Sequence, residues 1–384
     1  MTYKRLITTL LAILLLVAGC VQASPTATGT PAPGSPTSTP THLTPIYKLH
    51  MFVGGHGWAS DLNQSVYYNT RNFGEHWLVV TPPGLSSSNS GWGTTAAFPS
   101  GDIGWVCQTK NDSSATLYIS TDGGREWQIQ NLNFTCGQIS AINETEGYIL
   151  SDLGVGAGSQ YVSIHHTSDG GTSWDLRFEH EPANPDDHGL PTGGTKSYFG
   201  FLSSDIGLVA GYVPIPGSVY LFRSSDGGTS WIQSECSGLP VDDEQEAGVD
   251  RVIRVNSTTA ILPVRSYLAD GTNVTYFCST TDAAETWQYV GKLEGVDFSD
   301  FGSLLTGVAY GQGKMFQTED GGKTWTETTV GLPPAVTPIS VQMINDRVGF
   351  LTATVTPETL LDNRLYMTGN NGGDWQPLLA NIVE

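Results

Sequence analysis

The sequence is poor in positive charge and in helical periodicity. It holds 17 Lys and Arg against 37 Asp and Glu, and its formal net charge at pH 7 is −20. Nucleic acids and anionic membrane surfaces are bound through basic patches, so this balance argues against both as partners. Apolar residues rarely recur at helical spacing, which favours strands over helices as the elements of the fold.

The sequence also lacks the short motifs that mark common active sites. No Gly-x-Ser-x-Gly elbow, Walker-type phosphate loop or His-Glu-x-x-His motif is present, so esterase-type hydrolases, nucleotide-binding enzymes and zinc proteases have no support. No Cys-x-x-Cys pair or His/Cys cluster suggests a metal site. We therefore expect no cofactor and no metal.

The N-terminus has the features of an export signal. Lys4 and Arg5 lead into the apolar stretch Leu6–Ala18, which is too short for a membrane span and is followed by Gly and Cys20. The Ala-Gly-Cys ending resembles the lipobox of bacterial lipoproteins, in which the Cys is diacylated and becomes the new N-terminus. This resemblance implies that residues 1–19 are removed, that Cys20 is lipidated, and that the protein is anchored to the outer face of the cell membrane or to the outer membrane. A plain signal peptide with an incidental Cys is the alternative.

The next segment has the composition of a linker. Residues 21–45 are mostly Pro, Thr, Ser, Ala and Gly, with no Asp, Glu, Lys or Arg. Such a segment cannot bury a core, so we expect residues 20–45 to be a lipidated Cys with a disordered spacer. Residues 46–384 then form one large domain. After removal of residues 1–19 the chain keeps 15 basic and 37 acidic residues, and we expect it to contact the membrane through the lipid alone.

Seven copies of one eight-residue pattern account for seven of the ten tryptophans. Every copy starts with Ser or Thr, has Asp or Asn at its third position and ends in Trp, and six of the seven have Gly at the fifth. The copies are Thr70–Trp77, Ser120–Trp127, Thr167–Trp174, Ser224–Trp231, Thr280–Trp287, Thr318–Trp325 and Thr368–Trp375. A recurrence at roughly 50 residues indicates a repeat architecture.

The centre of each octapeptide predicts a tight hairpin turn. Gly supplies the positive φ that such turns require. The Asp or Asn can accept hydrogen bonds from backbone N–H groups one or two residues further on, and the Ser or Thr can do so more weakly. The Trp begins the next strand and buries apolar surface. The fifth copy has Ala283 and Ala284 in place of both glycines, and the first and seventh have Asn72 and Asn370, so we expect these turns to be looser or of another type.

A second signal precedes most copies. A glycine followed by an aromatic or aliphatic residue opens an apolar run, which predicts a buried strand. Such pairs begin at Gly57, Gly104, Gly147, Gly207, Gly307 and Gly349.

The two signals together resemble the Asp box, or bacterial neuraminidase repeat, and most of all the photosystem II assembly-factor type of propeller. The resemblance implies an all-β fold: a seven-bladed β-propeller of four-stranded antiparallel blades, with Asp-box hairpins between the third and fourth strands. Six blades plus a separate hairpin is the alternative, because the fifth repeat is degenerate in both signals. A structural role is implied for Asn72, Asp122, Asp169, Asp226, Asp282, Asp320 and Asn370, and for Trp77, Trp127, Trp174, Trp231, Trp287, Trp325 and Trp375.

Four cysteines follow Cys20. An even number in an exported chain favours two disulfides, for which three pairings exist. We expect Cys107–Cys136 and Cys236–Cys278, because each would link neighbouring blade elements. Free buried thiols are the alternative.

The blade order places the variable loops on the face opposite the octapeptides. Rigid scaffolds carry recognition on such loops, so this is the candidate binding face. Two insertions, Glu179–Lys196 and Glu235–Asp250, dominate it. Their acidic runs could be metal ligands but are more typical of solvated loop tips. Trp92 offers an aromatic anchor for a partner or sugar, or equally a cap over the mouth of the ring. The candidate binding residues are Trp92, Asp186, Asp187, His188, Asp242 and Asp243.

Two classes of function remain. Sialidases of the Asp-box family hold a carboxylate with three arginines, one of them in an Arg-Ile-Pro motif before the first box. This chain lacks that motif and has no Arg between Arg5 and Arg71. A glycanase needs two carboxylates about 5–9 Å apart, which 37 acidic residues leave open. We therefore expect a non-catalytic lipoprotein whose propeller binds a protein or glycan, as an assembly or stability factor or a surface receptor. An Asp-box glycoside hydrolase is the alternative, with a glycanase ahead of a sialidase.

Overall fold

The computed structural model describes residues 43–86, 93–111, 113–156, 158–180, 189–242, 244–268, 270–328, 331–333 and 335–383. The chain divides into two compact units, Met1–Pro40 and Thr41–Glu384. All described residues belong to the second unit, so the expected signal segment and Cys20 lie outside them. Within the described ranges, no helix has the length and apolar character needed to cross a membrane.

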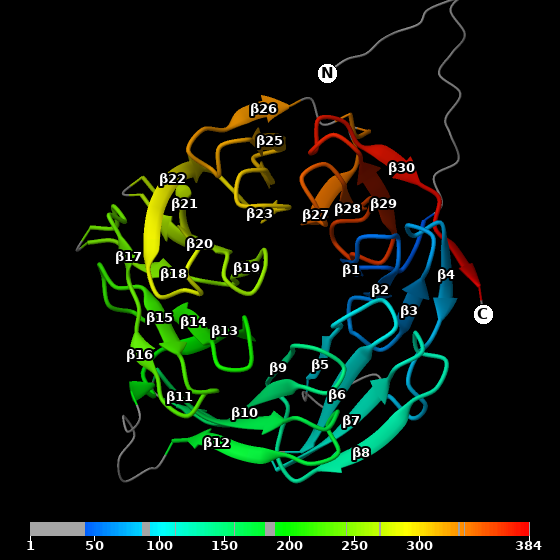
Figure 1. The fold of residues 1–384 in the computed structure, drawn as a ribbon. Coiled ribbons are helices and arrows are strands. Elements are labelled where there is room, and N and C mark those ends of the chain that lie inside the picture. Colours follow the sequence, from blue (N-terminus) through cyan, green and yellow to red (C-terminus); the bar gives the residue numbers. More distant parts are fainter. Residues whose placement is uncertain are drawn as a thin grey trace, which may run out of the picture. The chain divides into compact units, whose positions relative to one another are not determined.

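The described part of the chain is all-β, as predicted. Its strands form antiparallel groups of four that follow one another along the chain and are arranged in a ring (Figure 1). The first group is β1 (Lys48–Met51), β2 (Gly57–Ser60), β3 (Tyr67–Thr70) and β4 (His76–Val79). The second is β5 (Thr94–Ala97), β6 (Gly104–Asn111), β7 (Ser114–Ser120) and β8 (Gln128–Leu132). The third is β9 (Gln138–Ala141), β10 (Gly147–Gly156), β11 (Ser159–Thr167) and β12 (Asp175–Glu179).

The fourth and fifth groups are joined into one sheet. The fourth is β13 (Thr195–Phe201), β14 (Gly207–Tyr212), β15 (Tyr220–Ser224) and β16 (Ile232–Gln233). The fifth is β19 (Ile253–Arg254), β20 (Ala260–Tyr267), β21 (Asn273–Thr280) and β22 (Trp287–Glu294). Between them, β17 (Cys236–Ser237) pairs with β22, and β18 (Ala247–Gly248) pairs with both β14 and β20. The insertion Glu235–Asp250, predicted as a loop, is thus partly built into the sheet.

The last two groups complete the ring. The sixth is β23 (Phe298–Phe301), β24 (Gly307–Gly311), β25 (Lys314–Thr318) and β26 (Thr326–Thr328). The seventh is β27 (Thr337–Met343), β28 (Gly349–Thr354), β29 (Asn363–Thr368) and β30 (Gln376–Leu378).

Both ends of the domain take part in closing the ring. The C-terminal strand β31 (Asn381–Val383) adds to the first group, parallel to β4. Near the other end, Thr44 forms a β-bridge with Asn363 of the seventh group, and Ile46 is fully buried. The Gln342 side chain of β27 also hydrogen-bonds the backbone of Met51 on β1, accepting from its N–H at 2.7 Å and donating to its carbonyl at 3.1 Å. The first and last groups are therefore held together by main-chain and side-chain bonds.

The glycine-led apolar runs form the second strands of their groups. The first four residues of each such strand are buried, because neighbouring sheets cover both faces. The glycine leaves room for an aromatic ring of the preceding group: a Cβ at Gly104 would lie 2.9 Å from the Trp58 ring, and one at Gly147 would lie 2.8 Å from the Trp105 ring. The fifth group lacks this glycine, and its second strand begins at Ala260.

The connections between strands lie on two faces, which we name for use below. The turn face carries the octapeptides and the connections from first to second strands. The loop face carries the other connections. In every group the N–H of the octapeptide's fourth residue donates to a carbonyl of the first connection, as Gly123 does to Asp102 at 2.8 Å. The remaining six donors are Phe73, Gly170, Gly227, Ala283, Gly321 and Asn371.

Two disulfides fasten neighbouring parts of the ring. Cys107 of β6 is bonded to Cys136, which precedes β9, and so links the second and third groups. Cys236 of β17 is bonded to Cys278 of β21, which ties the insertion to the fifth group. These are the two pairs that the sequence favoured.

Candidate functional site

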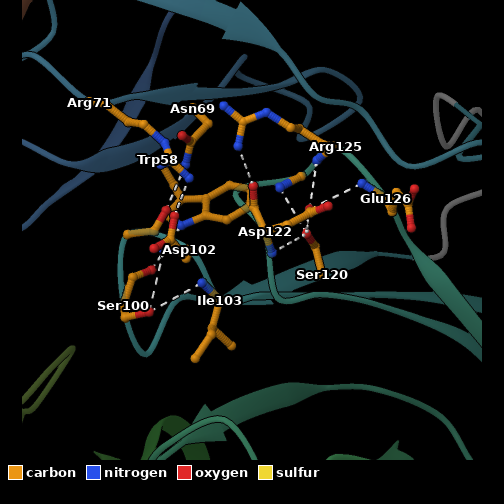
Figure 2. Close-up of polar contacts among 12 residues, drawn as sticks. Trp58, Asn69, Arg71, Ser100, Asp102, Ile103, Ser120, Asp122, Arg125 and Glu126 are labelled. Atoms are coloured by element: carbon orange, nitrogen blue, oxygen red, sulfur yellow. Dashed lines mark hydrogen bonds and ion pairs between the residues drawn. The ribbon is translucent and has the colours of Figure 1, made fainter.

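The octapeptides share one hydrogen-bonded turn, of which the second copy is representative (Figure 2). The Ser120 hydroxyl donates to Asp122 Oδ1 at 2.8 Å and accepts from the N–H of Gly124 at 2.8 Å. The N–H of Glu126 donates to the same Asp122 oxygen at 3.1 Å. The carboxylate therefore joins the first residue of the turn to its far side.

The same three bonds recur in all seven copies. The hydroxyl-to-Oδ1 distance is 2.8–3.0 Å. The fifth residue's N–H lies 2.8–3.2 Å from the hydroxyl. The seventh residue's N–H lies 2.9–3.1 Å from Oδ1. The prediction for the Asp or Asn was wrong in its spacing, because the side chain reaches the N–H four residues on. The prediction for the Ser or Thr was confirmed: in every copy its hydroxyl also accepts from the N–H two residues on, at 3.3–3.4 Å.

The three copies expected to be looser keep this turn. Ala283 and Ala284 adopt φ of 59° and 61°, the left-handed region that the two glycines occupy in other copies. In the first copy Phe73 has φ of 58°, and in the seventh Asn371 has φ of 57°. Left-handed backbone costs an L-residue about 1–2 kcal/mol, and the bonds around the turn offset that cost. Hydrogen bonding therefore preserves the turn where glycine is absent.

The turn carboxylates are strongly acidic. Hydrogen bonds from Ser173 lower the pKa of Asp169 to about 2, and those from Thr286 and Thr324 do the same for Asp282 and Asp320. A carboxylate with such a pKa stays ionised at neutral pH and is a poor proton donor. This supports a structural role for these residues.

These pKa values predict a loss of stability in acid. The three carboxyls titrate near 2 when folded and near 3.8 otherwise, so their contribution is present above about pH 4 and is lost as the pH falls toward 2. We expect the urea midpoint to fall over this range and to fall less steeply in the Asp169→Asn/Asp282→Asn/Asp320→Asn variant, since Asn370 supports the same turn. Asp175→Asn, at an exposed position, should leave the slope unchanged. Equal slopes in the wild type and the triple variant would contradict the assignment.

The octapeptide tryptophans differ in burial. Trp77, Trp231, Trp287 and Trp375 are at most 2% exposed. Trp127, Trp174 and Trp325 are only partly buried. Only Trp77 and Trp287 lie inside a strand; the others precede one by a single residue. The strand begins at the tryptophan itself only in the fifth copy; it begins one residue earlier in the first copy and one residue later in the other five.

Polar contacts link one group to the next on the turn face. In Figure 2, Arg71 of the first octapeptide pairs with Asp102 of the second group, and the Asn69 amide donates to the Gly101 carbonyl at 2.9 Å. The Trp58 indole N–H donates to the Ser100 carbonyl at 2.9 Å. The Arg71–Asp102 pair is exposed, so it adds little stability, whereas the other two bonds are more sheltered.

Most of the residues predicted for the loop face cannot be placed. Trp92, Asp186, Asp187, His188 and Asp243 lie outside the described residues. Asp242 is exposed, and its carboxylate accepts from the N–H of Glu244 at 3.0 Å within a local turn. Across the described ranges, no three His, Cys, Asp or Glu side chains are grouped as metal ligands would be.

A hollow of about 460 Å³ lies among the first strands of the groups, which face the middle of the ring in Figure 1. Lys48 and His50 of β1 line one part of it, and Arg251, Arg254 and Asp300 line another. Three cationic side chains therefore share this space with one carboxylate. Apolar residues form the rest of the wall, among them Leu49, Val252, Ile253, Val341 and Phe350.

The carboxylate in this hollow is already bonded. Asp300 Oδ1 lies 2.6 Å from an Arg251 nitrogen, and Asp300 Oδ2 accepts from the Met343 N–H at 2.7 Å. Burial raises the pKa of Asp300, and the Arg251 charge acts in the opposite direction. These bonds join the fifth, sixth and seventh groups and fix the position of Arg251.

Two other cations in the hollow have no such partner. Arg254 and Lys48 are exposed, and neither side chain forms a hydrogen bond or ion pair with a described residue. Partial burial lowers the pKa of Lys48. Enclosure by the sheets lowers the pKa of His50 to about 4 although its ring still reaches water, so its imidazole is neutral at pH 7.

Arg251 also borders a second hollow, of about 200 Å³. This hollow lies at the loop-face ends of β20, β21 and β23 and is lined by Arg265, Asp297 and Phe298 among others. Arg254, Phe301 and Met343 are the last residues of their first strands, so that end of the central hollow lies toward the turn face. Arg251, which the two hollows share, connects the central hollow with the loop face. Sequence reasoning missed this region, since its residues belong to first strands that carry no repeat signature.

Comparison with known proteins identifies the fold. No family model matches the chain, and no curated protein matches it in sequence. Its structure is similar to that of YCF48 from Cyanidioschyzon merolae, with a TM-score of 0.55 and 15% identity over 86% of this chain and 97% of the other. YCF48 bound to D1 peptide gives a TM-score of 0.52 and 15% identity over 87% and 91%. The fold is similar to that of the YCF48 propellers.

A carbohydrate-active protein is similar to a comparable degree. An ulvan lyase of polysaccharide lyase family PL25 gives a TM-score of 0.51 and 11% identity over 87% of this chain and 96% of the other. Likeness at these identities concerns the fold, so function must be argued from the residues of this chain.

Proposed function

We propose that this chain is a non-catalytic, seven-bladed β-propeller that binds a segment of a partner protein in the central hollow of the ring, which the segment enters from the loop face. Each four-strand group is one blade, and the octapeptides are Asp boxes that stiffen the scaffold. The observation that carries the proposal is the central hollow, where unpaired Lys48 and Arg254 adjoin a carboxylate that is already bonded.

The hollow suits binding better than glycoside hydrolysis. Hydrolysis requires two carboxyl groups, one to donate a proton and one to act as base or nucleophile. Asp300 is the one carboxylate among the residues described as lining the hollow, and its oxygens are bonded to Arg251 and to the Met343 N–H. Neither oxygen is placed to serve a substrate.

The cellular setting is part of the proposal. An export signal ending at Cys20 and a Pro/Thr/Ser-rich linker would hold the domain outside the membrane on a lipid anchor. The two disulfides fit an oxidising compartment.

Photocrosslinking in the native envelope tests which face binds a partner. A photoreactive amino acid is placed at Ile215 or Tyr267 on the loop face, which are 55% and 60% exposed, or at Val53 or Leu305 on the turn face, which are 71% and 56% exposed. We expect the same partner protein to be captured from both loop-face positions and not from the turn-face positions. Capture that is equal from both faces, or absent from all four positions, would overturn the proposal.

The glycan-active alternative is tested in parallel. The purified full chain is incubated with neutral and uronate-containing polysaccharides, and reducing ends are measured. We expect no cleavage. Cleavage that is lost in Asp300→Asn would replace the binding proposal with an enzymatic one.

A further inference from the structure

The cations of the central hollow stand out against the charge of the whole chain. The sequence carries 37 acidic residues against 17 basic ones, yet the residues lining the hollow include Lys48, Arg251 and Arg254 with Asp300 as their one carboxylate. Charges act over about 8 Å at physiological ionic strength, so the local set and not the net charge decides what binds there. The hollow therefore offers positive charge to an anionic group although the chain as a whole is negatively charged.

The three cations have different tasks. Arg251 is held by Asp300 and by the Ser299 carbonyl, so it forms part of the wall. Arg254 and Lys48 have no hydrogen-bonding or ionic partner among the described residues. For Lys48, the surrounding sheets also remove part of the contact with bulk water. A partly desolvated cation gains most from an anion that completes its hydrogen bonds. These two side chains are therefore the ones free to contact a ligand. The guanidinium of Arg254 and the ammonium of Lys48 together match a carboxylate, which accepts several hydrogen bonds at its two oxygens.

The remaining wall favours a peptide over a sugar as the bearer of that carboxylate. Leu49, Val252, Ile253 and Val341 offer aliphatic contacts, which suit the side chains of a short peptide. A volume of about 460 Å³ lies within the range of about 300–1,000 Å³ for sites that enclose small ligands. The hollow therefore has room for the end of a chain or for one acidic side chain with its neighbours.

We propose that the central hollow binds a carboxylate of a partner peptide, with Arg254 and Lys48 as its direct contacts. This inference rests on the proposed function and specifies the chemistry of the segment bound. The carboxylate can come from a chain terminus or from an Asp or Glu side chain, and both would be held in the same way.

Peptide selection tests the inference. The detergent-solubilised full chain is used to select from random heptapeptides with free C-termini, and affinities of the selected peptides are measured by calorimetry. We expect the peptides to carry a required carboxylate and to bind about tenfold or more weakly to Arg254→Gln and to Lys48→Gln, which is the size of one charged hydrogen bond. Amidation of the C-terminus and Asp/Glu-to-Asn/Gln changes then identify the source of the carboxylate.

The control variant also removes one positive charge, but on the turn face, away from the hollow. Lys323→Gln alters an exposed lysine of the sixth octapeptide and should leave affinity unchanged. Near-ultraviolet circular dichroism of the tryptophans checks that each variant is folded. Peptides that lack a required carboxylate, or that bind Arg254→Gln and Lys48→Gln as tightly as the wild type, would overturn the inference, as would binding of uronate oligosaccharides alone. If the loop face still crosslinks its partner in those cases, the proposed function stands and only the carboxylate site fails.

Discussion

Removing the Cys236–Cys278 disulfide, as the Cys236→Ala/Cys278→Ala variant, is expected to lower the free energy of unfolding by about 4 kcal/mol. The bond closes a loop with a sequence separation of 42, and the loss of that constraint enlarges the unfolded ensemble. The folded state is weakened as well, because without the disulfide this part of the insertion is held to β22 only by the two paired residues of β17. Urea unfolding followed by tryptophan fluorescence measures the change.

Removal of the other disulfide is the control that separates a general loss of stability from local release of the insertion. Cys107→Ala/Cys136→Ala removes a bond with a separation of 29 and should cost nearly as much stability. Only the Cys236→Ala/Cys278→Ala variant should become sensitive to limited proteolysis between Ser237 and Ala247, since only that bond holds the insertion. A loss below about 1 kcal/mol would mean that β17 and β18 hold the insertion without the disulfide.

Trp231→Ala is expected to cost about 3–5 kcal/mol, the range for removing a large buried side chain. Trp231 is 2% exposed and packs with Phe201 and Phe222 in the core of the third and fourth groups. Its replacement leaves a cavity that the surrounding strands cannot fill without moving. The midpoint of urea unfolding reports the loss.

Trp174→Ala is a matched control, because both indoles donate to the carbonyl three residues earlier. The distances are 3.1 Å to Gly171 for Trp174 and 3.1 Å to Gly228 for Trp231. The lost hydrogen bond is therefore common to both variants, and their difference measures burial. Since Trp174 is only partly buried, its variant should be clearly the more stable of the two. Equal losses would show that the turn bond, and not packing, sets the contribution of these tryptophans.

The sequence predicted most of what depends on local chemistry. Each octapeptide determines its own turn, because all the groups that form it lie within eight positions. These groups are a hydroxyl, a carboxylate or carboxamide, and residues able to adopt positive φ. The second strands were also found, because glycine and a following apolar run mark them locally. The degenerate fifth copy was misjudged, since propensity alone does not include the bonds that hold Ala283 and Ala284 in the left-handed region.

The remaining features depend on residues that are distant in sequence. β17 and β18 have two residues each and no periodicity, and they exist because their edges meet strands of other groups. Lys48 and Arg254 are far apart in the sequence and line one hollow only after the ring has closed. The low content of basic residues also directed attention away from a cationic site, because a chain-wide balance does not show where the few cations gather.

The position of β31 has a consequence for how the ring folds. Its residues, Asn381–Val383, pair with β4, which precedes the strands of the six other groups in the sequence. The ring therefore closes only when segments from both sides of those groups meet. A chain cut before Asn381 would present β4 as an unpaired edge, open to proteases and to other strands.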